Sequence, residues 1–83
     1  MANITIIEDN RVIAFLIEAS LKAANHTPTL CASGNEGLRT MRAAPPDLLV
    51  LDVNLPDISG FDVALTMRQE VALSHVPILM LTA

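Results

Sequence analysis

The sequence has very few aromatic residues: it contains no tryptophan, no tyrosine and only two phenylalanines among its 83 residues. This scarcity argues against sites that stack nucleic-acid bases on aromatic rings. Hydrophobic residues nevertheless make up 52% of the chain, a share that excludes a disordered protein. The core must therefore be built from aliphatic side chains and methionine.

Positive charge is also scarce, because five lysines and arginines stand against nine aspartates and glutamates, for a net charge of -4. Proteins that bind nucleic acids or anionic membranes need a basic patch to do so. We therefore expect no direct nucleic-acid or membrane binding. A cationic partner, including a metal ion, suits this chain better.

Cysteine and long apolar runs are the remaining absences. Cys31 is the single cysteine, so no disulfide can form within the chain. No apolar stretch reaches the about 18 to 20 residues that a membrane span needs, and the N-terminus lacks the features of a signal peptide. No repeat or linker divides the sequence, so we expect one cytoplasmic domain over residues 1–83.

What the sequence does contain is an alternation of short apolar runs and helical patterns. Strands are expected at residues 3–7, 26–33, 47–52 and 76–83, with helices at 10–24, 33–44 and 60–71 between them. A βαβαβαβ order predicts a parallel α/β sheet with right-handed crossover helices on its faces.

Each helical pattern has an apolar face that should pack on the sheet. In the first helix this face is expected to contain Ile13, Leu16, Ile17, Leu21 and Ala24. In the third helix, it is expected to contain Val63, Ala64, Met67 and Val71. The second helix should begin after Ser33, since Ser33 and Glu36 have the spacing of a capping box.

Polar groups end three of the four expected strands. Glu8 and Asp9 follow the first strand, Asp52 ends the third and Thr82 ends the fourth. Parallel strands bring their carboxyl ends to one edge of the sheet, where ligands bind. Three carboxylates at that edge repel one another, so either their pKa values rise or a cation neutralises them. Oxygen ligands of this kind favour Mg²⁺, which also recruits phosphate oxygens.

A metal beside Asp52 would let its carboxylate attack a phosphoryl group and form an aspartyl phosphate. The hydroxyl of Thr82 could donate a hydrogen bond to the transferred group. Each residue also has a simpler interpretation: Asp52 as a loop cap, the acidic pair as a helix start, and Thr82 as an ordinary strand residue.

Three segments resemble the receiver domain of two-component response regulators: "IIEDN", "PDLLVLDVNLPDISGFDV" and "VPILMLTA". Their acids, proline, glycine and final Thr-Ala occur in the register of that family, and the resemblance covers all 83 residues. It implies a flavodoxin-like three-layer fold with strand order 2-1-3-4. It also implies that the chain is a signalling switch domain that promotes its own aspartyl phosphorylation, and not an enzyme.

Carried over by position, the resemblance implies that Asp52 accepts a phosphoryl group from a sensor histidine kinase or a phosphotransfer protein. Thr82 would be the switch hydroxyl, and the backbone amide of Ala83 would lie near the phosphate.

The metal ligands implied by the resemblance are Glu8, Asp9, Asp52 and the backbone carbonyl of Asn54. Asp9 would bind Mg²⁺ directly and Glu8 mostly through water. Many family members have aspartate at the position of Glu8.

The chain also departs from the family, because receivers end with a further helix, strand and helix and carry a lysine on that strand. The only lysine here is Lys22, in the first expected helix. The alternative is therefore a truncated receiver fragment that binds metal or a partner without switching. Its fourth strand would be an open sheet edge, so we expect self-association as a dimer. A phosphatase with an aspartate nucleophile ranks last, because such enzymes prefer an acid at the position of Asn54.

Overall fold

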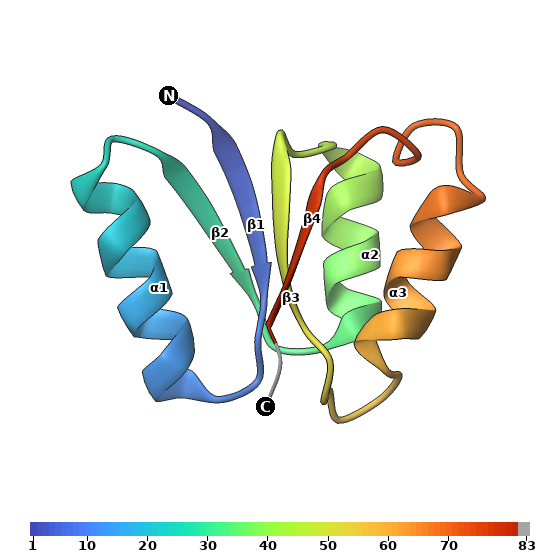
Figure 1. Ribbon diagram of the computed structural model, residues 1–83, viewed down its shortest axis with the longest axis horizontal. Helices are drawn as coiled ribbons and strands as arrows, with labels where there is room; N and C mark the ends of the chain where they lie inside the picture. Colours follow the sequence, from blue (N-terminus) through green and yellow to red (C-terminus); the bar gives the residue numbers. More distant parts are fainter. Residues whose placement is uncertain (82–83) are drawn as a thin grey trace.

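Four parallel strands form a single sheet in the computed structural model, which describes residues 1–81. The sheet has the order β2-β1-β3-β4, as the sequence predicts. Figure 1 shows three layers, with α1 on one face of the sheet and α2 and α3 on the other. The elements are β1 (Asn3–Ile7), α1 (Arg11–Ala23), β2 (Thr27–Cys31), α2 (Gly34–Ala43), β3 (Leu48–Asp52), α3 (Gly60–Arg68) and β4 (Ile78–Leu81).

The two central strands are largely buried on both faces, which explains why β3 is apolar up to Asp52 and why β1 consists of β-branched residues after Asn3. Side chains alternate between the faces, so each strand supplies two hydrophobic clusters. On the α2 and α3 face the cluster includes Ile7, Leu51 and Met67. On the α1 face it includes Ile6 and Val50. This packing fixes the register of β1 against β3.

A polar side chain caps each helix at its first turn. Asn10 accepts hydrogen bonds from the amides of Val12 and Ile13 at the start of α1. Ser33 accepts from the amide of Glu36 at 3.2 Å, so the predicted start of α2 is confirmed. Figure 1 shows that these helix starts lie at the same end of the molecule as the ends of the strands.

The third helix is shorter than the sequence predicts, because α3 ends at Arg68 and the expected helix continued to residue 71. The guanidinium group of Arg68 donates to the carbonyl oxygens of Ser74 and Val76, both at 3.0 Å, and so holds the following segment in turns. Val71 was expected on the buried face and is 88% exposed, and that prediction is wrong. Leu73 is fully buried in the core instead.

The buried face of α1 also differs from the prediction. Leu16 is 65% exposed and Ile13 is partly exposed, although both were expected to pack on the sheet. Ala14 is the fully buried residue of this helix. Ile17 and Leu21 pack against the buried cluster on this face of the sheet, as the sequence predicts. Among the residues described, no helix is long and apolar enough to cross a membrane.

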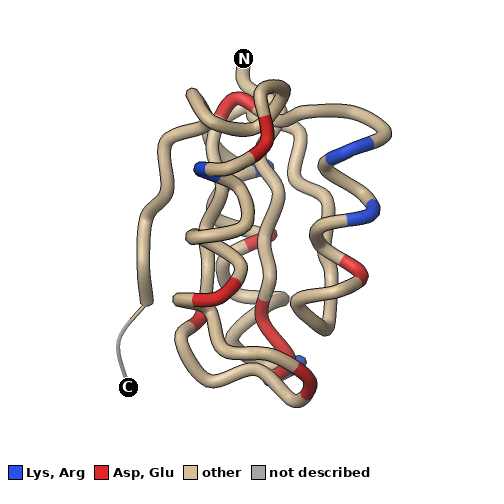
Figure 2. The backbone as a smooth tube through the Cα atoms, turned by 90° about the vertical axis from the view of Figure 1, so that its right-hand side faces the viewer, with Lys and Arg blue, Asp and Glu red and all other residues tan. Residues whose placement is uncertain are grey.

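The topology determines where a ligand can bind. The chain passes from β1 outward to β2 and returns to β3 on the other side of β1, so the order of the strands reverses between β1 and β3. In open parallel sheets ligands bind in the crevice at the carboxyl ends of two such strands. Figure 2 shows several acidic residues gathered at the end of the molecule opposite the N-terminus, where the strands end.

Candidate metal centre

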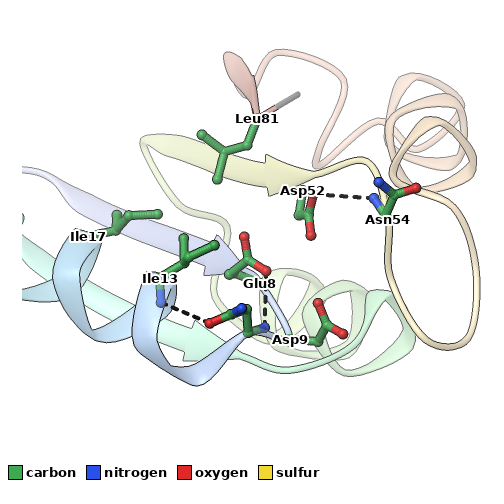
Figure 3. Close-up of a pocket in the computed structure, with 8 residues that line it drawn as sticks. Glu8, Asp9, Ile13, Ile17, Asp52, Asn54 and Leu81 are labelled. Carbon is green, nitrogen blue, oxygen red and sulfur yellow. Dashed lines mark hydrogen bonds between the residues drawn. The ribbon is translucent and has the colours of Figure 1, made fainter. Parts of the chain in front are cut away.

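Three carboxylates converge at the carboxyl ends of β1 and β3. Glu8, Asp9 and Asp52 each offer one oxygen, and these oxygens all lie within 4.8 Å of one another. Figure 3 shows the three side chains facing a common space. The sequence therefore predicted correctly that these acids lie together, because adjacent parallel strands deliver them to the same edge.

The carboxylates line an open pocket of about 640 Å³. The other residues that line it are Asn10, Ile13, Ile17, Asn54 and Leu81. Figure 3 shows the acids on one side and Ile13, Ile17 and Leu81 on the other. The pocket is thus acidic at the strand ends and apolar between α1 and β4.

Backbone amides fix two of the carboxylates. Glu8 Oε2 accepts a hydrogen bond from the amide of Asn10 at 3.1 Å. Asp52 Oδ1 accepts one from the amide of Asn54 at 3.2 Å. Both bonds join an acid to the residue two positions later, so the loops after β1 and β3 curl round the acids. Asn54 is placed in the pocket by this turn.

Glu8 is the most buried of the acids, with 4% of its surface exposed. Burial raises the pKa of Glu8, and a hydrogen bond with Asp52 and the negative charges of Asp52 and Asp9 raise it further. The hydrogen bond from the amide of Asn10 acts in the opposite direction. A buried carboxylate with two acidic neighbours favours either a proton or a bound cation.

The donor set fits Mg²⁺. The three converging ligand atoms are carboxylate oxygens, which are the ligands that hard divalent cations prefer. The open pocket leaves room for water and phosphate oxygens, which Mg²⁺ retains when it binds to one or two carboxylates.

Not every residue singled out from the sequence can be placed. Thr82 and Ala83 lie outside the described residues. Lys22 pairs with Glu18 on α1 at 3.6 Å. Among residues 1–81, no lysine or arginine lines the pocket.

Two residues of this region were missed by sequence reasoning. Asn10 lines the pocket and caps α1, a role that its position before a helical pattern could have indicated. Asp57, in the loop after β3, accepts hydrogen bonds from the amides of Gly34 and Asn35, both at 2.9 Å. These bonds join residues more than twenty positions apart, so no local sequence pattern could have revealed them.

Gly60 explains how α3 can begin so close to the site. Its amide donates to the carbonyl oxygen of Val53 at 2.8 Å, which closes the loop of residues 53–60 at its base. A Cβ atom at Gly60 would overlap the backbone carbonyl of Asp52. The close approach of α3 to the end of β3 therefore requires glycine.

Comparison with known proteins identifies the family of the chain. The family model for the response regulator receiver domain matches residues 4–83. The chain is 41% identical, over its whole length, to the transcriptional regulatory protein AfsQ1 of Streptomyces coelicolor. It is 31% identical, over 98% of its length, to the polar-differentiation response regulator DivK of Brucella ovis. The chain spans 36% of the length of the first relative and 66% of the second.

A solved structure shows the same fold. The receiver domain of a sensor histidine kinase from Pseudomonas aeruginosa, with a magnesium ion coordinated in its active site cleft, superposes with a TM-score of 0.94. It is 32% identical in sequence, and the match covers 99% of this chain and 67% of that one. The fold class that the sequence predicts is thereby confirmed. The chain belongs to the response regulator receiver domain family.

Proposed function

We propose that the chain accepts a phosphoryl group on Asp52 from the phosphohistidine of a sensor histidine kinase or phosphotransfer protein, in a Mg²⁺-dependent way, and thereby switches a signalling output. The observation that carries this proposal is the convergence of Glu8, Asp9 and Asp52 in an open pocket at the carboxyl ends of the central strands. A phosphodonor inside the cell makes the cytoplasm the expected compartment.

The transfer requires an oxygen of Asp52 to reach the phosphorus atom. The Oδ–P bond forms as the P–N bond of the donor breaks, and the electron pair stays on the imidazole nitrogen, which then takes a proton. Asp52 is suited to this role because it is partly exposed, lines the pocket and is oriented by the amide of Asn54. Bound Mg²⁺ would offset the repulsion between the carboxylate and the phosphate oxygens.

The residues proposed to hold Mg²⁺ are Asp9, Asp52 and the backbone carbonyl of Asn54, with Glu8 acting mostly through water. Burial of Glu8 supports an indirect role, because its carboxylate is already engaged by the amide of Asn10. The roles of Thr82 as the switch hydroxyl and of the Ala83 amide near the phosphate stay predictions from the family resemblance.

The test is incubation of the chain with Mg²⁺ and acetyl phosphate, followed by intact mass measurement. We expect the added mass of one phosphoryl group, lost in the Asp52→Asn variant and when EDTA removes the metal. A folded chain that acquires no label dependent on Asp52 would contradict the proposal. The Asp9→Ala variant should bind Mg²⁺ more weakly, and unchanged affinity would remove Asp9 from the ligand set.

A second proposal concerns self-association, in keeping with the alternative of a metal-binding module that does not switch. Within the described residues β4 is one of the two edge strands of the sheet, with β2 at the other side, and its Leu79 is 55% exposed. An edge strand offers backbone groups to a second strand. We expect dimers in sedimentation experiments, and Leu79→Lys should weaken them. Val71→Lys, on an exposed turn, is the matched control and should leave them intact.

A further inference from the structure

The side chain of Asp57 joins the loop after β3 to the first turn of α2. Its Oδ1 atom accepts a hydrogen bond from the amide of Gly34 and its Oδ2 atom accepts one from the amide of Asn35, both at 2.9 Å. These amides are among the first of the helix and have no partner within it. The hydrogen bonds with the backbone lower the pKa of Asp57 to about 2, so the carboxylate is charged at neutral pH.

The residue after Asp57 makes the same connection by packing. A Cβ atom placed on Gly34 would lie 2.5 Å from Cγ1 of Ile58, so the side chain of Ile58 rests directly on the backbone of Gly34. Ser33 separately accepts from the amide of Glu36. The backbone amides in the first turn of α2 therefore donate hydrogen bonds both to the helix's own cap, Ser33, and to the loop after β3.

The other end of this loop is fixed at β3. Gly60 and Val53 close its base through a hydrogen bond of 2.8 Å, and Asp52 accepts from the amide of Asn54. The segment from Val53 to Gly60 is thus held at its base by β3 and at Asp57 by α2. Asn54, which lines the pocket, lies between these two attachments.

We propose that Asp57 is a positioning residue of the metal centre: by clamping the loop to α2 through the amides of Gly34 and Asn35, it sets the position of the backbone at Asn54. Asp57 does not itself line the pocket. The inference rests on the proposed function, because it assumes that Mg²⁺ binds at the carboxylate cluster and uses the Asn54 carbonyl. It adds α2 to the elements that determine the affinity for the metal.

The expected size of the effect follows from the behaviour of residues that orient metal ligands. Removing such a partner lowers metal affinity by roughly 10- to 100-fold. Asp57 acts on one ligand, and the base of the loop stays closed without it. We therefore expect the Mg²⁺ affinity of Asp57→Ala to fall by roughly tenfold, near the lower end of that range. Asp57→Asn retains one acceptor oxygen for one amide and should lie between Asp57→Ala and the wild type.

The matched control is Asp47→Ala. Asp47 also accepts a hydrogen bond from a backbone amide, that of Asn3 at 2.8 Å. However, Asp47 precedes β3, so it lies at the amino ends of the strands, away from the carboxylate cluster. Both alanine variants lose one negative charge and the hydrogen bonds that the carboxylate accepts from backbone amides, two at Asp57 and one at Asp47. A merely structural role of Asp57 would thus make the two variants alike in metal binding.

The experiment titrates the wild type and the three variants with Mg²⁺, measured by calorimetry and by the chemical shift of the Asn54 amide, with urea unfolding as a check on folding. The proposal expects weaker Mg²⁺ binding in the order wild type, Asp57→Asn, Asp57→Ala, and unchanged affinity in Asp47→Ala. Wild-type affinity in Asp57→Ala, or an equal loss in Asp47→Ala, would overturn the proposal and leave the proposed function standing. A wild-type chain that binds no Mg²⁺ would overturn both. If Asp57→Ala does not fold, the affinity of Asp57→Asn decides.

Discussion

Replacement of Asp52 by asparagine should stabilise the metal-free protein, although it removes the residue on which the proposed chemistry depends. The oxygens of Glu8, Asp9 and Asp52 lie within 4.8 Å of one another. Asparagine has nearly the same shape as aspartate, and its Oδ1 atom can still accept the hydrogen bond from the amide of Asn54. The substitution therefore removes repulsion with little loss of structure.

The magnitude can be worked from the separation of the charges. Two unit charges 4.8 Å apart repel by about 0.9 kcal/mol in water and by about 3.5 kcal/mol at an effective dielectric constant of about 20. Asp52 is partly exposed and Asp9 is exposed, so solvent screening places the value in the lower half of this range. We expect a gain of about 1–2 kcal/mol in the free energy of unfolding.

Thermal unfolding in EDTA, followed by far-ultraviolet circular dichroism, measures this gain, because the chain has no tryptophan or tyrosine to report by fluorescence. In a domain of this size, 1 kcal/mol shifts Tm by about 4–8 °C. The difference in Tm between Asp52→Asn and the wild type should be smaller in about 1 M salt, because the Debye length there is about 3 Å and the repulsion is screened. Added Mg²⁺ should raise the Tm of the wild type more than that of Asp52→Asn, because the metal neutralises the same charge.

Asp47→Asn is the control for loss of charge alone, since Asp47 lies at the amino ends of the strands and accepts a hydrogen bond from the amide of Asn3. We expect it to give no gain in stability. A neutral or destabilising effect of Asp52→Asn in EDTA at low salt would refute the conclusion that the three carboxylates repel one another in the folded state. An equal gain in Asp47→Asn would instead assign the effect to net charge.

Three further predictions follow from individual contacts. Gly60→Ala should lower both stability and Mg²⁺ affinity, because its Cβ atom would displace the backbone carbonyl of Asp52; urea unfolding and metal titration test this, and wild-type values in both would contradict it. Met67→Ala removes a fully buried side chain and should cost about 2–5 kcal/mol in urea unfolding, so a smaller loss would mean that the core collapses around the cavity. The lowered pKa of Asp57, about 2 against an ordinary 3.8, stabilises the folded state above the ordinary value. That contribution should disappear as the pH falls towards 2, and the acid unfolding profile of Asp57→Asn should lack it.

The fold could be predicted from the sequence because its determinants are local. Central strands such as Leu48–Asp52 are continuous apolar runs, and the helices between them are amphipathic, so the βαβ order follows from periodicity. The convergence of Glu8 and Asp52 follows from the same order, since parallel strands end at one edge. These inferences needed no knowledge of which side chains touch.

The errors arose where distant contacts decide the structure. The apolar spacing of Val63, Met67 and Val71 predicts a longer α3, but the guanidinium group of Arg68 binds carbonyls of the following turns and α3 ends. The link between Asp57 and α2 depends on how the loop after β3 lies against another helix. A sequence pattern records periodicity along one element, and it does not record which loop reaches which helix.

The carboxylate cluster proposed to bind Mg²⁺ also connects proton binding with metal binding. β1 and β3 are central strands held in register by buried side chains on both faces, so the strand ends next to the acids are held side by side. Burial and the neighbouring carboxylates raise the pKa of Glu8, so a proton on this carboxyl would reduce the repulsion. A cation bound between the same oxygens would offset the repulsion without that proton and would lower the pKa of Glu8. By linkage, protons and Mg²⁺ compete, so Mg²⁺ affinity should fall as the pH is lowered through the raised pKa of Glu8, and Glu8→Gln should reduce this dependence.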